Sequence, residues 1–268
     1  MNRVATSVAV TGVGVLAAHA LPAVTFWPTL RDMLLPGLSG HGDQGHVALT
    51  FDDGPHPRST PFFLRELDSR GIKATFFLLG SELARAPQLG KEMAAAGHEV
   101  ALHGWAHRRM LWYGPRRTYD EMARGKDLIT AATGIPPRWF RPPYGVLTSS
   151  ALVAARRLEL TPVLWSCWGW DWSAKSTPAS VYDTVLGGLR GGGTVLLHDS
   201  DVAASVGAWR ATLGALPRLL DECARRGLTV GPLGEHNVVS HPVLGGKPNL
   251  LPASLPAGSA EPAAAATG

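Results

Sequence analysis

A regular alternation of short apolar runs with amphipathic helical stretches constrains this chain most strongly. The runs are rich in aromatic and β-branched residues and are predicted to be strands. The seven predicted strands are His46–Phe51, Lys73–Leu78, His98–His103, Arg138–Phe140, Thr161–Ser166, Gly193–His198 and Leu228–Val230. The stretches between them space apolar residues at helical intervals, and several end at a glycine. The six predicted helices are Thr60–Arg70, Ser81–Ala96, Tyr119–Thr133, Ser149–Leu158, Pro178–Leu189 and Ala208–Arg226.

Strands that alternate with helices form parallel sheets, because a right-handed crossover must return the chain before the next strand can join. Seven strand–helix units predict an α/β domain whose sheet curls into a closed or nearly closed barrel. An open, doubly wound sheet is the alternative architecture.

The two ends of the chain differ from its middle. Residues 1–41 are predicted to be a signal peptide or membrane anchor plus a linker, because Val4–Ala18 is almost wholly apolar and Ala18-His19-Ala20 fits a cleavage site. An N-terminal helix packed on the domain is the alternative. Residues 239–268 are rich in Pro, Ala and Gly, so we expect a disordered tail there and a folded domain over residues 42–238.

Composition excludes several classes of protein. Apolar residues make up 45% of the chain, enough for a packed core, and two cysteines are too few for a disulfide scaffold or a four-cysteine zinc fold. The formal charge is only +4, and many of the arginines occur as scattered pairs such as Arg108-Arg109 and Arg116-Arg117. We interpret these pairs as solvated surface and predict no nucleic-acid partner.

Chemically reactive side chains gather at the carboxyl ends of the predicted strands. These ends share one rim of a parallel barrel, where barrel enzymes place their catalytic residues. The residues concerned are Asp52, Asp53, His103, His107, Arg141, Asp171 and His198. The sequence therefore predicts one site assembled from several strands.

A metal site is predicted within this group. His103 and His107 are four residues apart, so a helical turn places both imidazoles on one side, and Asp53 is the natural third ligand of a catalytic zinc site. Asp52 is then free to accept a proton from water as a general base. The alternatives are a pair of surface histidines and a plain Asp-Asp-Gly-Pro turn.

Two further residues fit supporting roles. Arg141 precedes two prolines, which favours extended backbone, and a guanidinium beside Asp52 would lower the pKa of that carboxyl and hold it in place. His198 ends an apolar run and would donate a proton to a leaving group. The alternatives are a surface arginine stacked on Trp139 or Phe140 and a hydrogen-bonded core histidine.

Five short motifs in this sequence resemble those of the polysaccharide deacetylases, the NodB-homology domain of carbohydrate esterase family 4. The resemblance covers about residues 44–235. In chain order the motifs are Thr50–Pro55, His103–His107, Arg141–Gly145, Asp171-Trp172 and Leu196–His198.

The resemblance implies a distorted (β/α)7 TIM-like barrel in a single domain that binds a divalent metal, usually zinc. It implies that Asp52 is the general base and that Asp53, His103 and His107 are the metal ligands.

The resemblance also implies roles for the later motifs. Arg141 would steady the general base, His198 would be the general acid, and the backbone N–H of Tyr144 would help to hold the oxyanion. Trp172 and Leu196 would line the acetyl pocket.

Two positions depart from the family pattern. Gly104 stands where a Ser or Thr hydroxyl usually ties down the metal loop, which predicts a less rigid loop. Trp168 stands where an Asp usually tunes the general acid. This leaves Asp171 or Asp199 to take its place beside His198, or leaves that histidine less basic.

We therefore expect a metal-dependent hydrolase that removes N-acetyl groups from an amino-sugar polysaccharide or oligosaccharide of the peptidoglycan or chitin type. The alternatives are an O-acetyl esterase of the xylan type, another amide hydrolase on the same fold, and a non-catalytic carbohydrate-binding protein. The expected partner is an acetylated glycan. The expected location is outside the cytoplasm, either secreted or associated with a membrane through the N-terminal segment.

Overall fold

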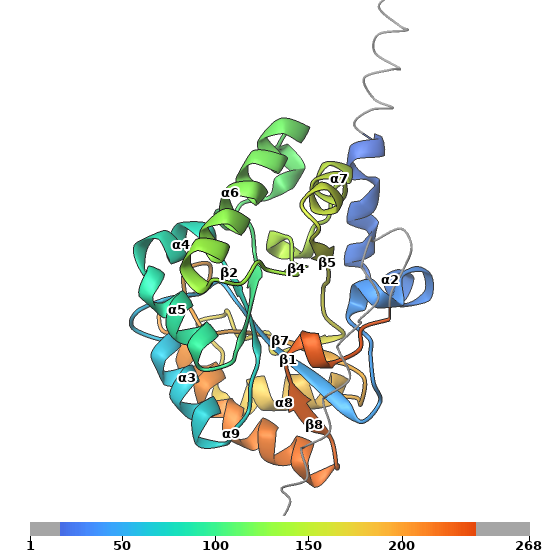
Figure 1. Ribbon diagram of the computed structural model, residues 1–268. Coiled ribbons are helices and arrows are strands. Elements are labelled where there is room, and N and C mark those ends of the chain that lie inside the picture. The colour runs from blue at the N-terminus through green and yellow to red at the C-terminus, as the bar shows by residue number, and fades with distance from the viewer. Residues whose placement is uncertain (1–16, 240–268) are drawn as a thin grey trace, which may run out of the picture.

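In the computed structural model, residues 17–239 are described, and they form a curled sheet surrounded by helices (Figure 1). The strands in this part are β1 (His46–Asp52), β2 (Thr75–Leu78), β3 (Glu99–Leu102), β4 (Trp139–Phe140), β5 (Thr161–Pro162), β6 (Cys167–Trp168), β7 (Thr194–His198) and β8 (Thr229–Gly231). The α-helices are α2 (Pro28–Leu34), α3 (Thr60–Ser69), α4 (Gly80–Arg85), α5 (Pro87–Ala95), α6 (Pro115–Thr133), α7 (Ser149–Arg157), α8 (Pro178–Gly188) and α9 (Trp209–Arg225). The 3-10 helices are η1 (Leu21–Phe26), η2 (Pro36–Ser39), η3 (Met110–Trp112), η4 (Pro143–Gly145) and η5 (Leu233–Glu235).

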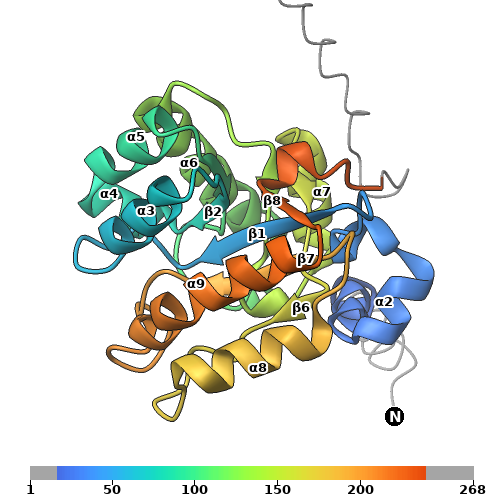
Figure 2. The ribbon, with the colours of Figure 1, turned by 90° about the horizontal axis from the view of Figure 1, so that it is seen from below.

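All strand pairs in the described part are parallel, and the main path of the sheet is β5-β4-β3-β2-β1-β7-β6. The eighth strand, β8, pairs with the first half of β1. Figure 2 shows β1 at the centre, with helices on both sides of it. The expected distorted (β/α)7 barrel in a single domain is confirmed. It is an incompletely closed barrel, because β5 and β6 are the two free ends of the path.

The predicted strand Thr161–Ser166 is interrupted at this opening. Its first two residues form β5 beside β4, and the chain leaves the sheet before β6 joins β7. The Leu164 N–H donates to the Leu38 carbonyl at 2.6 Å, and the carbonyls of Leu164 and Trp165 accept from arginine side chains at 2.7 Å each. Because these groups already have partners, no strand pairs with this stretch.

The folded unit extends further toward the N-terminus than the predicted boundary at residue 42. The segment that contains η1, α2 and η2 fills the opening between β5 and β6, and the side chain of Leu38 is fully buried there. Arg31 is also buried, and its guanidinium donates to Ser39 Oγ at 2.7 Å and to the Trp165 carbonyl at 2.7 Å. These bonds satisfy backbone groups that a closing strand would otherwise satisfy, so residues 21–41 are more than a linker.

Two helix boundaries differ from the predicted ones because of proline. The predicted helix Ser81–Ala96 is divided into α4 and α5 at Ala86, since the residue before Pro87 is pushed out of helical geometry. Helix α6 begins at Pro115, four residues before the predicted start at Tyr119, because proline is well suited to the first turn of a helix.

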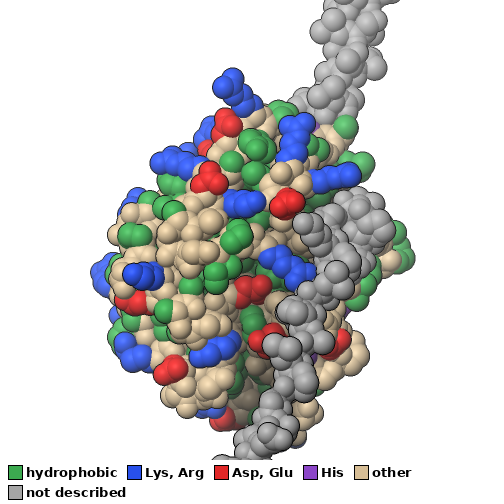
Figure 3. Space-filling view, viewed as in Figure 1, with side chains coloured by type: hydrophobic (Ala, Val, Ile, Leu, Met, Phe, Trp, Pro, Cys, Tyr) green, Lys and Arg blue, Asp and Glu red, His purple; other side chains and the backbone are tan. Residues whose placement is uncertain are grey.

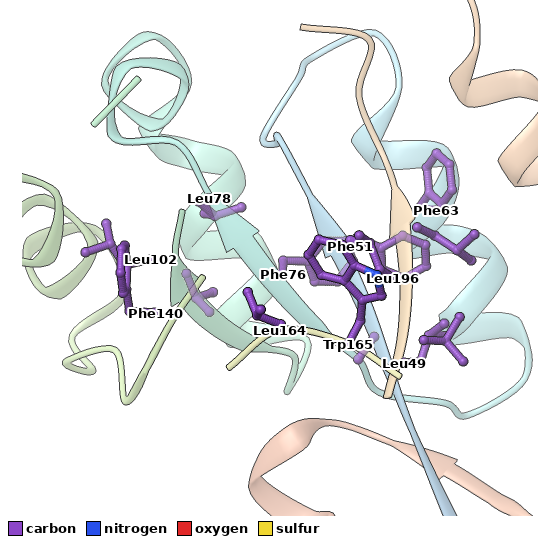
Figure 4. Close-up of a cluster of buried hydrophobic side chains, with 14 of the residues drawn as sticks. Leu49, Phe51, Phe63, Phe76, Leu78, Leu102, Phe140, Leu164, Trp165 and Leu196 are labelled. Carbon is purple, nitrogen blue, oxygen red and sulfur yellow. The ribbon is translucent and has the colours of Figure 1, made fainter. Parts of the chain in front are cut away.

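Alternation along the strands produces two apolar layers. Phe51, Phe63 and Phe76 pack in the layer between sheet and helices, with neighbouring ring centroids 5.1 and 5.3 Å apart (Figure 4). Residues that point to the other face of the same strands, such as Ala48 in β1 and Phe77 in β2, belong to a smaller cluster inside the barrel. The same two-residue period directs Asp52 inward at the end of β1.

Two predictions fall mainly on residues that the structure does not describe. The apolar run Val4–Ala18 and the tail after residue 239 lie almost entirely outside residues 17–239. Within that range, none of the helices combines the length and apolar character needed to cross a bilayer.

Candidate functional site

Two adjacent carboxylates enter the barrel mouth at the end of β1. Asp52 is the last residue of the strand and points inward, and Asp53 follows with φ of 75°. Asp adopts this left-handed conformation more readily than most residues, so the turn needs no glycine at this position. Both carboxylates are buried and line the same pocket.

Two imidazoles approach Asp53 from the loop after β3. The His103 Nδ1–H donates to the Arg141 carbonyl at 2.8 Å, which fixes the ring and leaves Nε2 for another partner. His103 Nε2 and His107 Nε2 lie 3.4 and 3.5 Å from Asp53 Oδ1. The loop therefore places both rings against one carboxylate oxygen.

These three residues fit a divalent cation. One ligand atom from each lies within 4.8 Å of the others, and Asp53 Oδ1 is a buried atom with no hydrogen-bond partner in the described chain. Two imidazole nitrogens and one carboxylate are a donor set typical of catalytic zinc sites, which keep a position open. The predicted ligands Asp53, His103 and His107 are thus brought together.

The electrostatics of the three residues favour the same occupant. Burial, strengthened by neighbouring carboxylates, raises the pKa of Asp53 to about 7. Burial, with help from nearby positive groups, lowers the pKa of His103 and of His107 to about 3. The imidazoles are therefore neutral, which is the form that binds metal, and a cation would stabilise the buried carboxylate.

Asp52 is held by a buried arginine, as predicted. Arg141 Nη1 donates to Asp52 Oδ1 at 2.7 Å and to Thr50 Oγ1 at 2.9 Å. Arg141 is fully buried, and its Cζ lies 4.0 Å from the centre of the Phe77 ring, so it is not a surface side chain. The predicted lowering of the Asp52 pKa is outweighed: burial raises this pKa, and Arg141 opposes the rise.

His198 faces the pair of carboxylates from the other side of the pocket. Its Nδ1 lies 2.8 Å from Asp171 Oδ1, and its backbone N–H donates to Asp171 Oδ2 at 2.8 Å. Burial alone would lower the pKa of His198, but the charge and hydrogen bond of Asp171 prevail, with further help from Asp53 and Asp52, and raise it to about 10. The imidazole is therefore protonated, and its Nε2 lies 3.9 Å from Asp53 Oδ2.

The departure at Trp168 is explained by this contact. Asp171 supplies the carboxylate beside His198, and Thr212 Oγ1 donates to it at 2.7 Å, so the general-acid candidate keeps a tuned partner. Asp199 forms no hydrogen bond or ion pair with His198 among the described residues, and its Oδ2 accepts from Thr60 Oγ1. Of the two substitutes expected from the sequence, the structure selects Asp171.

The departure at Gly104 has a different explanation. Gly104 has φ of 91°, where a Ser or Thr side chain would be strained. The loop is held through its backbone instead: the N–H groups of Gly80 and Ser81, at the start of α4, donate to the carbonyls of Gly104 and Trp105 at 2.9 and 2.7 Å. A hydroxyl at position 104 is therefore unnecessary for a rigid loop.

Asp52, Asp53, His103, His107 and His198 all line one pocket of about 390 Å³. The predicted substrate residues Tyr144, Trp172 and Leu196 line it. Sequence reasoning missed five other lining residues, and they are Phe26, Arg109, Val146, Trp165 and Ala203. Trp168, noted only as a departure, also lines the pocket and stacks on Trp165 with centroids 5.5 Å apart. Phe26 had no signal in the sequence, because it lies in the segment predicted as a linker.

Comparison with known proteins agrees with this geometry. Residues 39–163 match the polysaccharide deacetylase family. A chitooligosaccharide deacetylase of Bradyrhizobium is 35% identical over 194 residues, covering 70% of this chain and 88% of the relative. A peptidoglycan-N-acetylglucosamine deacetylase of Bacillus cereus is 30% identical over 187 residues, covering 70% of this chain and 68% of the relative.

Solved structures share the fold as well. A pseudoenzyme of carbohydrate esterase family 4 from Bacillus anthracis superposes with a TM-score of 0.66 at 25% identity, covering 73% of this chain and 66% of the other. Because a pseudoenzyme has this fold, the fold alone does not decide catalysis, and the side chains must. On the family match and the 35% identity to a relative of which 88% is covered, this chain belongs to the polysaccharide deacetylase family.

Proposed function

We propose that this protein is a metal-dependent hydrolase that removes N-acetyl groups from an amino-sugar glycan of the chitin or peptidoglycan type. One observation carries the proposal: a buried Asp–Arg pair, an Asp-His-His cluster and a protonated His–Asp pair converge on a single pocket. These are the parts that hydrolysis of an unactivated amide requires, namely a base, an electrophile and an acid.

Asp53, His103 and His107 are the proposed ligands of the cation, and zinc is the proposed metal because two imidazoles and a carboxylate suit it. When bound, such a cation supplies Lewis acidity, which polarises a carbonyl group and lowers the pKa of water.

The protein's own groups supply the proton transfers. Asp52 accepts the proton of the attacking water, and Arg141 holds its carboxylate in position through the 2.7 Å hydrogen bond. The backbone N–H of Tyr144 donates to the oxyanion that forms from the acetyl carbonyl. His198 gives its proton to the departing amine, and Asp171 stabilises the imidazolium before this step. The products are acetate and a free amino sugar.

The base assignment is tested with Asp52→Asn. Acetate release is measured on chitin oligomers, peptidoglycan and acetylxylan with enzyme supplied with zinc. We expect release from the N-acetylated glycans by the unmodified protein and a loss of at least about 10²-fold in the variant. Unchanged turnover in the variant overturns the role of Asp52, and release from acetylxylan alone overturns the N-acetyl assignment. Release from no substrate, together with retained glycan binding, identifies a carbohydrate-binding protein instead.

We further propose that the domain acts outside the cytoplasm, secreted or anchored through its N-terminal residues. The apolar run Val4–Ala18 and the small residues Ala18 and Ala20 support this. A fusion of residues 1–41 to a reporter that is active only after export tests the proposal. An inactive reporter contradicts it.

A further inference from the structure

Arg109 is the only Lys or Arg among the described residues that line the pocket. The sequence suggested that it belongs to a solvated pair with Arg108. On the face seen in Figure 3, basic side chains are indeed scattered among acidic ones. Arg108 and Arg109 are both exposed, but Arg109 lines the pocket, whereas Arg108 is not among the lining residues of the described chain.

The position of Arg109 relative to the reacting groups is fixed by Tyr144. The guanidinium carbon of Arg109 lies 5.0 Å from the centre of the Tyr144 ring. The centre of that same ring lies 4.2 Å from the centre of the His107 ring. One aromatic ring therefore separates Arg109 from a metal-ligand candidate, so Arg109 stands beside the place where the acetylated sugar must bind.

The other charged groups at the pocket are either paired within the protein or face the candidate cation site. Asp52 is paired with Arg141, and His198 is paired with Asp171. Asp53 faces the two imidazoles of the cation site. Arg109 forms no ion pair with any Asp or Glu in residues 17–239. It is thus a positive charge at the pocket that no described protein group neutralises, and its planar fork of donors suits a carboxylate.

The part of the pocket lining that comes from β6 and the loop after it has another character. Trp168 and Trp172 lie there with ring centroids 5.1 Å apart, and aromatic faces of this kind bind the apolar faces of sugar rings. The pocket lining therefore offers both aromatic surfaces for stacking and an unpaired cation.

Building on the proposed deacetylase function, we infer that Arg109 selects glycans that carry a carboxylate on the acetylated amino sugar or on its neighbour. The preferred substrate class is then an acidic amino-sugar glycan, and neutral chitin oligomers are poorer substrates. The carboxylate accepts hydrogen bonds from the guanidinium, and no bond is formed or broken in this recognition.

The experiment compares three tetrasaccharides with the zinc-loaded full chain. They are neutral chitotetraose, a peptide-free tetrasaccharide of alternating N-acetylglucosamine and N-acetylmuramic acid, and the same tetrasaccharide with each lactyl carboxylate converted to its methylamide. We expect kcat/KM to be about tenfold higher for the carboxylate form than for the methylamide, and the ratio to fall as salt is raised.

The matched variants are Arg109→Gln, which removes the charge, and Arg108→Gln, which removes the neighbouring charge outside the pocket. Arg109→Gln should bring the ratio of kcat/KM for the carboxylate form to that for the methylamide close to one. Arg109→Lys should keep part of the preference, and Arg108→Gln should leave the ratio unchanged.

An equal fall in kcat/KM on both substrates in Arg109→Gln shows that Arg109 only supports Tyr144, and overturns the inference. A ratio near one in the unmodified protein also overturns it while leaving the deacetylase proposal intact. Absence of acetate from all three substrates counts against the deacetylase proposal itself.

Discussion

Histidines on the two sides of the pocket differ in the partner of one ring nitrogen. On the metal-ligand side, His103 donates its Nδ1–H to a backbone carbonyl, and its pKa is lowered to about 3. On the opposite side, His198 presents its Nδ1 to the Asp171 carboxylate, and its pKa is raised to about 10. His103 is buried and His198 is only 13% exposed at the same barrel mouth, so burial alone cannot account for the difference.

The comparison shows how one residue type serves two functions within a few ångströms. A neutral partner leaves the cost of burying a charge unopposed, so the imidazole stays neutral and offers Nε2 to a cation. A carboxylate partner outweighs that cost, so the imidazole stays protonated and offers a proton. A bound dication near Asp53 would reduce part of the rise at His198, because that carboxylate contributes to it.

The strongest way to break the comparison is to remove the charge on the metal side. In Asp53→Asn we expect loss of bound metal and a fall in kcat of about 10³-fold or more, because one of three ligands is lost. The metal content of the purified protein and acetate release check this. Asp120→Asn, at an exposed position on α6, is the control and should retain both. Full metal occupancy in Asp53→Asn would rule out Asp53 as a ligand.

Although Asp53→Asn should lose activity, the metal-free variant should be more stable than the metal-free parent protein. The pKa of Asp53 is about 7 in the fold and 3.8 when exposed, so its burial removes stability as pH rises from about 4 to 7. Metal-free Asp53→Asn should therefore unfold at a higher temperature than the metal-free parent at pH 8. An unchanged or lower Tm would contradict the electrostatic account.

A second substitution removes the carboxylate that distinguishes the acid side. In Asp171→Asn we expect kcat to fall about 10²-fold and the alkaline limb of the pH–rate profile to move to lower pH, because His198 loses its proton more easily. Thr212→Val, which removes only the hydrogen bond to Asp171 Oδ2 and keeps the carboxylate charge, is the control and should not move the limb to lower pH. An alkaline limb that stays in place in Asp171→Asn would exclude His198 as the group that titrates there.

A third histidine, His98, lies away from the pocket and extends the comparison to folding stability. We expect its substitution to have the smallest effect of those discussed. His98 is buried, its Nδ1 accepts from the Ala74 N–H at 3.2 Å, and its pKa is lowered to about 4, chiefly by burial. The unfolded chain binds this proton first, so folding stability is lost as pH falls from about 6.5 toward 4. In His98→Gln the loss between pH 7 and pH 5 should be about 2 kcal/mol smaller, as measured by urea unfolding. Identical pH dependence in the two proteins would show that the fold does not lower the pKa of His98.

Local patterns in the sequence were sufficient to predict most of the architecture. The alternation of strands with helices predicted the parallel barrel, because the spacing of apolar residues within each strand or helix indicates which of its faces is buried. The opening between β5 and β6 was not predictable in this way. It depends on Arg31, Leu38 and the carbonyls of residues 164–165, which are more than a hundred positions apart and carry no common periodicity.

The reactive groups of the pocket were likewise predictable only in part from the sequence. The sequence by itself determined which reactive groups stand at strand ends, because a period of two residues fixes the face on which each side chain emerges. Only the tertiary structure decided which imidazole meets a carbonyl and which meets a carboxylate, and that Phe26 and Arg109 border the pocket. The reason is that the charge state of a buried group depends on the distance to partners from other strands, and that distance is set by packing of the whole barrel.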